Sequence, residues 1–242
     1  MNDTASITDA ASRMTAESFL SRLAERGIEY VFANSGTDFA PIIEALSRTS
    51  GSNLKYPRFI TVPHENVAVA MAHGYYQVSG KPAVVMVHVT VGTANAICAL
   101  MNAARDNVPV ILGAGRTPIT ETGHAASRNR SIHWGQEMFD QGGLAREFVK
   151  WDFELRAGQP AQSVVDRALD IAMSEPRGPV YLTLPREVLA DDAVPPRRDT
   201  VRPLGASAAV PSFNAIELAA AILSTADFPL LLTSSAGRAP TP

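Results

Sequence analysis

The stretch that decides the fold is residues 59–80, FITVPHENVAVAMAHGYYQVSG. Its apolar start, residues 59–62, stops at Pro63, and a run compatible with a helix, residues 67–78, begins just after Glu65. Strand, short turn and helix in this order deliver a side chain to the crevice at the carboxyl edge of a parallel sheet. Glu65 therefore either stabilises the start of an apolar helix or has a functional role in the crevice.

The alternation of strands and helices continues on both sides of this stretch. Apolar runs bounded by glycine, proline or polar residues predict strands at 30–33, 58–62, 83–89, 108–112, 148–153 and 179–184. Helical patterns fall at 15–26, 41–48, 67–78, 94–105, 134–146 and 161–174. We therefore predict an α/β fold, a doubly wound, mainly parallel sheet of about six strands with helices on both faces.

The outer parts of the chain differ from this domain. Residues 1–13 are polar and read as a disordered leader, and residues 14–190 contain all of the predicted sheet. Residues 191–211 are rich in proline and read as a linker. Residues 212–242 hold one expected helix, 213–224, and one expected strand, 229–233, which cannot bury a core alone. We interpret this last part as the truncated start of a second domain.

Composition excludes several classes of function. With 46% hydrophobic and 19% charged residues and a net charge of −3, the chain has no basic surface for nucleic acid. No run of about 18 apolar residues is present to span a membrane. Cys98 is the only cysteine, so an intrachain disulfide is impossible, a cytoplasmic location fits best, and the thiol is expected to pack on an apolar helix face.

Several known chemical motifs are also missing. The five histidines show no metal-ligand spacing, so no metal site is predicted, and the chain lacks a phosphate-binding P-loop, a dinucleotide fingerprint and a nucleophile elbow. What remains is a set of side chains in the loops at one edge of the sheet. These are Thr37, Glu65, His88, Thr93, Asn95, Arg116 and Gln136.

Glu65, Thr93 and Asn95 lie within sequence blocks whose order resembles a known family. From about residue 15 to residue 188, the chain resembles the N-terminal, pyrimidine-binding domain of thiamine diphosphate-dependent enzymes, the group of acetohydroxyacid synthase and benzoylformate decarboxylase. The blocks are His64-Glu65, Ala72-His73-Gly74-Tyr75, Gly80-Lys81-Pro82, Gly92-Thr93-Ala94-Asn95-Ala96, Arg105-Asp106-Asn107-Val108-Pro109, Pro176-Arg177-Gly178-Pro179-Val180 and Leu184-Pro185-Arg186-Glu187-Val188. His73 stands where the family usually has an acid. Residues 14–190 are accordingly expected to be such a domain, and residues 212–242 the opening of the family's central domain.

The resemblance implies a specific role for Glu65. In the family, the matching glutamate hydrogen-bonds N1′ of the cofactor's aminopyrimidine and so helps to activate the thiazolium C2 carbon. Gly92, Thr93 and Asn95 match the family's cofactor-binding turn. A carboxyl buried beside Val62 and other apolar neighbours holds a proton more readily, which suits this role. The alternative is a first-turn glutamate that stabilises its helix by about 0.3–1 kcal/mol through the helix dipole.

Three further positions match less closely. His88, at the end of a strand, resembles a histidine that shuttles protons near the substrate in the benzoylformate decarboxylase pattern, although a lone histidine there is often structural. Thr37 lies where that pattern holds the substrate carboxylate, the alternative being a simple turn. Gln136 matches a glutamine that faces the active site. Arg116 replaces the usual glutamine, so no role is carried over to it.

The first hypothesis is part of an enzyme that acts on a 2-keto acid with thiamine diphosphate as cofactor. By resemblance, the diphosphate and Mg²⁺ bind a Gly-Asp-Gly domain absent from this sequence, and any FAD contacts would also lie in absent domains. The resemblance places the site between two subunits, so a homo-oligomer or a second chain bearing the diphosphate domain is expected. This chain alone is expected to be inactive. The alternatives are one subunit of a split enzyme and a non-catalytic assembly or regulatory module.

Overall fold

The computed structural model describes residues 13–48, 55–196, 203–206 and 209–233. The chain forms two compact units, Met1–Ala206 and Ser207–Pro242, which are described separately. The predicted leader, residues 1–13, lies outside the described residues apart from Arg13. The unit boundary falls inside the stretch predicted as a linker, and the assignment of the units to particular domains stays a prediction.

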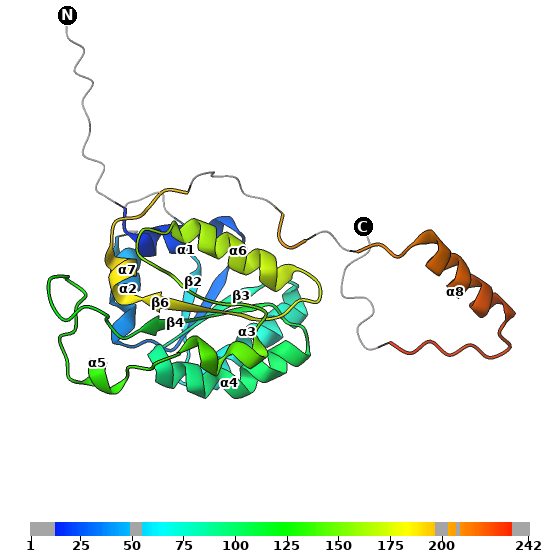
Figure 1. The fold of residues 1–242 in the computed structure, drawn as a ribbon, viewed down its shortest axis with the longest axis horizontal. Coiled ribbons are helices and arrows are strands. Elements are labelled where there is room, and N and C mark those ends of the chain that lie inside the picture. Colours follow the sequence, from blue (N-terminus) through cyan, green and yellow to red (C-terminus); the bar gives the residue numbers. More distant parts are fainter. Residues whose placement is uncertain (1–12, 49–54, 197–202, 207–208, 234–242) are drawn as a thin grey trace, which may run out of the picture. The chain divides into compact units, whose positions relative to one another are not determined.

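A sheet of six strands, all parallel, forms the centre of the first unit (Figure 1). The strands lie in the order β2-β1-β3-β4-β6-β5. They are β1 (Tyr30–Ala33), β2 (Arg58–Thr61), β3 (Ala83–Val87), β4 (Val110–Arg116), β5 (Asp152–Glu154) and β6 (Val180–Pro185). The helices are α1 (Thr15–Glu25), α2 (Ala40–Ser47), α3 (Glu65–Ser79), α4 (Val89–Arg105), α5 (Ile132–Gly135), α6 (Ala161–Met173) and α7 (Arg186–Ala190). The predicted α/β fold with a parallel sheet is confirmed.

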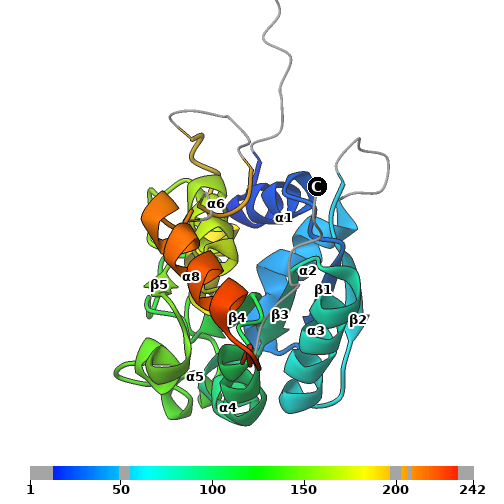
Figure 2. The ribbon, with the colours of Figure 1, turned by 90° about the vertical axis from the view of Figure 1, so that its right-hand side faces the viewer.

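Helices cover both faces of this sheet and make two cores. Figure 2 shows α1 and α6 on one face and α3 and α4 on the other. One core joins α1, α2, α6 and α7 to the sheet, and the other joins α3 and α4 to it. The middle strands are buried along their whole length, as in β3, because both of their faces are covered. This explains why they read as unbroken apolar runs.

The strand order brings three loops together at the carboxyl edge. β1 lies between β2 and β3, so the chain leaves β1 towards one side of the sheet and returns past it to β3. Such a reversal opens a crevice outside the carboxyl ends of the strands, where ligands bind in open α/β sheets. The 3₁₀ turn η1 (Thr37–Phe39), α3 and α4 begin at this edge. In Figure 1, α5 and α7 lie at the same end of the unit.

The start of α4 differs from the prediction. The expected helix began at Ala94, but α4 begins at Val89, directly after β3. Gly92 was read as part of a turn, whereas it lies inside the helix. A Cβ on Gly92 would come within 2.9 Å of the Cβ of Val87, so the glycine lets α4 start close against the strand.

The predicted helix at 134–146 was wrong. The structure has the short α5 and two 3₁₀ turns, η2 (Gly142–Leu144) and η3 (Arg146–Phe148), in its place. Asp140 Oδ1 accepts a hydrogen bond from Gly143 N at 3.0 Å, a local bond that competes with a helix. The strand expected at 148–153 is correspondingly shorter and later, at β5.

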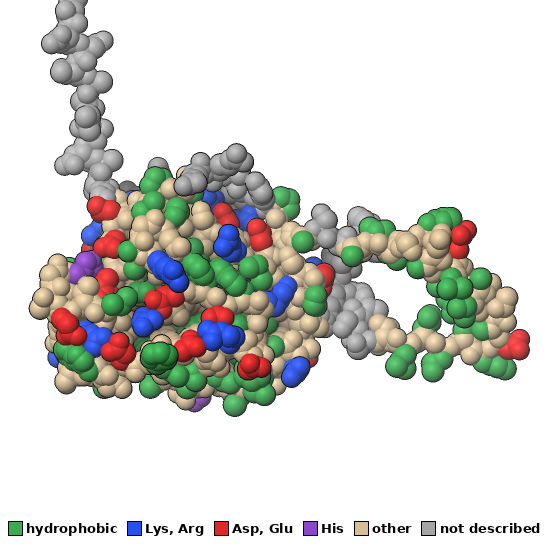
Figure 3. Space-filling view, viewed as in Figure 1, with side chains coloured by type: hydrophobic (Ala, Val, Ile, Leu, Met, Phe, Trp, Pro, Cys, Tyr) green, Lys and Arg blue, Asp and Glu red, His purple; other side chains and the backbone are tan. Residues whose placement is uncertain are grey.

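The second unit contains the expected helix, α8 (Phe213–Thr225). All of its residues are exposed, and Figure 3 shows hydrophobic side chains along it. The strand expected at 229–233 was wrong, because among the described residues this unit offers no neighbouring strand to pair with. Residues 234–242 lie outside the described residues. In the described parts of both units, no helix is long and apolar enough to cross a membrane.

Candidate functional site

Glu65 is the first residue of α3, but it is not the residue that caps the helix. His64 does so, because its Nδ1 accepts a hydrogen bond from Asn66 N at 3.1 Å. The Glu65 side chain instead receives a hydrogen bond on Oε2 from Asn95 Nδ2 of α4 at 3.2 Å. Glu65 is only 7% exposed. The structure thus separates the capping role from the carboxylate, and joins two of the predicted cofactor residues.

A second carboxylate, that of Asp38, is hydrogen-bonded to the ring of His88. Asp38 Oδ1 is 2.6 Å from His88 Nδ1, and Asp38 Oδ2 accepts a hydrogen bond from Val89 N at 3.2 Å. Asp38 is 4% exposed. Its hydrogen bond raises the pKa of His88, against the lowering effect of burial, and the negative charge of Glu65 adds to the rise. The site therefore contains a histidine poised to carry a proton.

The backbone beside His88 is strained, and neighbouring loops pack closely against this residue and Asp38. Val89 has φ of 34°, a left-handed conformation that is rare for a β-branched residue. A Cβ on Gly36 would lie 2.1 Å from His88 Nδ1, and one on Gly115 would lie 2.0 Å from Asp38 Oδ2. Glycines at these two positions allow neighbouring loops to pack directly against the Asp38–His88 pair. Strain of this kind often marks a functional site.

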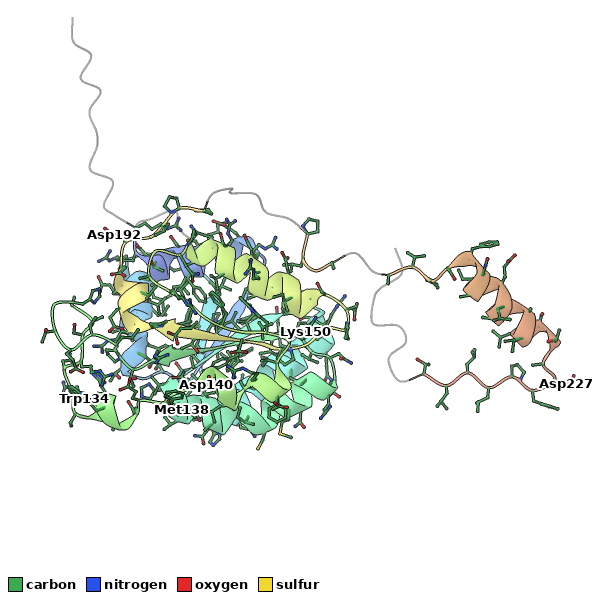
Figure 4. All side chains as sticks on the ribbon, viewed as in Figure 1. Trp134, Met138, Asp140, Lys150, Asp192 and Asp227 are labelled. Carbon is green, nitrogen blue, oxygen red and sulfur yellow. The ribbon has the colours of Figure 1, made fainter. Side chains whose placement is uncertain are left out.

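Gln136 lies on the other ring nitrogen of His88. The distance from Gln136 Nε2 to His88 Nε2 is 3.0 Å. The main-chain carbonyl of Gln136 accepts a hydrogen bond from Thr90 Oγ1 at 3.1 Å. Thr37 and Gln136 line one small hollow, together with Asp38 and Val89. Figure 4 shows Trp134, two residues before Gln136, at the opposite end of the unit from Lys150. The predicted substrate residues thus lie around the histidine.

Gly92 and Thr93 face the interior. Thr93 is fully buried, and its hydroxyl donates to Val89 O at 2.8 Å and lies 2.8 Å from the hydroxyl of Tyr181. Burial raises the pKa of Tyr181. In this structure Gly92 and Thr93 shape the start of α4, while Asn95 lies beside Glu65, and their role towards a cofactor stays a prediction. The expectation that Cys98 is packed was wrong, since it is exposed on α4.

Sequence reasoning missed Asp38 as a site residue. The aspartate was visible in the loop after the first strand, but its partner His88 follows a different strand. Only the adjacency of β1 and β3 brings them together. Arg116, the last residue of β4, pairs with Glu154 of β5 and lines the same hollow as Thr37 and Gln136. Among the described residues, no three His, Cys, Asp or Glu side chains are grouped to hold a metal ion.

Comparison with known families identifies the domain that carries these residues. The profile of the family "Thiamine pyrophosphate enzyme, N-terminal TPP binding domain" matches residues 13–144, more than half of the chain. The chain belongs to this family. The matched residues include Glu65, Asn95, Asp38, His88 and Gln136. The thiamine pyrophosphate (thiamine diphosphate) family predicted by the sequence blocks is confirmed.

Individual relatives agree with the family. Benzoylformate decarboxylase of Pseudomonas aeruginosa is 30% identical over 174 residues, which cover 71% of this chain and 30% of that protein. Acetolactate synthase catalytic subunit of Aspergillus candidus is 26% identical over 193 residues, which cover 76% of this chain and 26% of that protein. The chain therefore spans less than a third of these curated relatives.

A solved structure shows the same fold. The thiamine diphosphate-dependent 4-hydroxybenzoylformate decarboxylase of Rhodococcus jostii RHA1 matches with a TM-score of 0.72 at 25% identity. The match covers 89% of this chain and 38% of that one. The family thus includes decarboxylases and acetolactate synthases, and this chain has the N-terminal thiamine diphosphate-binding domain of such enzymes.

Proposed function

We propose that this chain supplies the pyrimidine-binding half of a thiamine diphosphate-dependent enzyme that acts on a 2-keto acid. The observation that carries the proposal is the Glu65–Asn95 pair. A buried carboxylate with one amide donor, at the carboxyl edge of the sheet, suits a ring nitrogen that shares a proton with it. When bound, thiamine diphosphate supplies the electron sink for decarboxylation or carboligation.

The residues of this chain divide into two groups around that cofactor. Glu65 would share a proton with N1′ of the aminopyrimidine, and Asn95 would orient the Glu65 carboxylate through its hydrogen bond. Gly92 and Thr93 support both by fixing the start of α4 against β3. His88 donates and accepts a proton near the substrate, because Asp38 raises its pKa. We assign the substrate contacts to Thr37 and Gln136, which line the hollow beside His88.

We further propose that another domain covers this site and binds the diphosphate and Mg²⁺, either in a second copy of the full protein or in a partner chain. The exposed faces of α3 and α4 support this. From residue 66 to residue 104 the only Asp, Glu, Lys or Arg is Lys81. Val67, Met71, Val91 and Met101 are each more than a third exposed on these two helices. Uncharged, apolar helix faces of this kind are typical of interfaces.

The proposal is tested with the 242-residue chain by NMR. Adding thiamine diphosphate and Mg²⁺ should shift the resonances of Glu65 and Asn95 weakly and without saturation, because the proposal assigns the diphosphate to another domain. Glu65→Gln should abolish these shifts, and the exposed Glu44→Gln should keep them. Shifts confined to other residues would refute the cofactor role, and 2-keto acid turnover by the chain alone would refute the need for a second domain.

A further inference from the structure

The helix α7 begins with two buried charged side chains that have no part in the function proposed above. Arg186 and Glu187 are each 6% exposed, and they follow directly on β6. Buried charges are costly unless they are hydrogen-bonded. The partners of these two residues are therefore informative, and nearly all of them belong to the backbone of two loops.

Glu187 binds the beginning of the long segment between β4 and α5. Its Oε1 accepts hydrogen bonds from Ile119 N at 2.6 Å, Thr120 N at 2.9 Å and Thr120 Oγ1 at 3.0 Å. Its Oε2 is buried and has no hydrogen-bond partner in the described part of the chain. Glu187 Oε1 thus accepts all three hydrogen bonds. Two of them come from main-chain amides, so the carboxylate fixes the backbone of this segment.

Arg186 binds the same segment further along and also reaches a second loop. Its Nη2 donates to Ala126 O and to Ser127 O, both at 2.8 Å, and its Nε donates to Ala126 O at 3.0 Å. Its Nη1 donates to Thr37 O at 3.5 Å, in the loop that follows β1. One planar guanidinium therefore joins two loops that are far apart in the sequence.

These two loops carry the two partners of His88. Asp38 follows Thr37 directly, and Gln136 follows α5, the short helix that comes after the segment that Arg186 and Glu187 bind. We propose that Arg186 and Glu187 are positioning residues, which hold Asp38 and Gln136 on the two ring nitrogens of His88. The consequence for catalysis rests on the proposed function, whereas the positioning itself is a property of this chain alone.

The geometry favours positioning over simple packing. Arg186 and Glu187 bind main-chain atoms in both loops, so they set the path of the backbone whatever the loop side chains are. Charge-assisted hydrogen bonds are also shorter and stronger than neutral ones. Both residues stand at the end of a central strand, a rigid element from which to hold a site.

The test uses isosteric or charge-preserving variants of the 242-residue chain. Glu187→Gln and Arg186→Lys weaken the hydrogen bonds with little change in size. The exposed pair Glu44→Gln and Arg48→Lys on α2, whose members lie 3.0 Å apart, is the matched control. Hydrogen exchange of residues 117–136 and the ¹⁵N resonances of both His88 ring nitrogens are measured in each.

In Glu187→Gln, exchange at Ile119 and Thr120 should rise about tenfold or more, as expected for loss of a bond to a charged group. In Arg186→Lys, exchange should rise instead around Ala126 and Ser127, whose carbonyls Arg186 binds. Exchange in β3 and β4 should stay unchanged. The His88 Nε2 resonance should move as it does in Gln136→Ala, and the effects of Glu187→Gln and Gln136→Ala should not add. Arg186→Lys should also move the Nδ1 resonance, because the loop with Asp38 is released.

Unchanged His88 resonances in variants whose loop exchange has risen would overturn the proposal, and so would unchanged loop exchange. If Glu187→Gln does not fold, Glu187→Asp, which keeps the charge but shortens its reach, gives the same two measurements. These outcomes do not depend on thiamine diphosphate. A failure of the cofactor test therefore leaves the positioning role intact, and the reverse also holds.

Discussion

Replacement of Asp38 by asparagine gives a sharp test of the Asp38–His88 pair. The carboxylate bonds both His88 Nδ1 and Val89 N. An asparagine has only one oxygen, so one of these two donors loses its acceptor. Leaving a buried donor unsatisfied costs about 1–3 kcal/mol, and we expect the free energy of unfolding to fall by this amount near neutral pH.

The loss should also depend on pH, with a sign that follows from His88. Its pKa is raised in the folded protein by the hydrogen bond that its ring donates to Asp38. A raised pKa contributes stability that is fully present below the unfolded-state value, about 6.5, and is lost as pH rises through the folded-state value. Asp38→Asn removes this contribution, and the remaining burial disfavours the charged imidazole. The variant should therefore be destabilised more at acidic than at alkaline pH.

Urea unfolding of the wild type and Asp38→Asn at about one unit below and about two units above the ordinary histidine pKa measures this difference. In a His88→Asn background the extra loss at acidic pH should vanish. An equal loss at both pH values, or a pH dependence that survives without His88, would refute the reasoning.

Further substitutions test the close packing around the site, each measured by urea unfolding. Gly36→Ala should cost about 1–3 kcal/mol, because its Cβ would lie 2.1 Å from His88 Nδ1. At Gly74 an added Cβ meets nothing within 4 Å, so Gly74→Ala should instead stabilise α3 by about 0.5–1 kcal/mol. A lower free energy of unfolding in Gly74→Ala would contradict the conclusion that this position is open. Thr93→Val should cost about 1–3 kcal/mol by removing the hydroxyl that lies against that of Tyr181, whereas Thr93→Ser should cost less.

Most of the sheet was predictable because its strands are buried on both faces. The run at Ala83–Val87 has no polar residue. Such a run is typical of a strand that is covered by helices on both faces. Turn residues marked its boundaries, as at Gly80, whose φ of 71° ends α3 in the left-handed conformation. Such local signals are properties of neighbouring residues, and they lie in the sequence itself.

The errors came where a residue serves a packing contact that the pattern of its neighbours does not reveal. Gly92 looks like a turn residue, but it is glycine because α4 passes within reach of Val87. Asp38 looked like an ordinary loop residue because nothing local shows that β1 and β3 are neighbours. The strain at Val89 has no local signal either, since valine disfavours that conformation. Side chains of the site were visible in the sequence, but their pairing required the order of the strands.

The arrangement of charges at the carboxyl edge links the two halves of the site. His88 is acted on by two carboxylates, since Asp38 raises its pKa through a direct hydrogen bond and Glu65 adds to the rise from across the crevice. Any ligand that changes the charge of Glu65 therefore changes the proton affinity of His88. The carboxylate proposed to meet the cofactor and the histidine proposed to serve the substrate are thus coupled within this one chain.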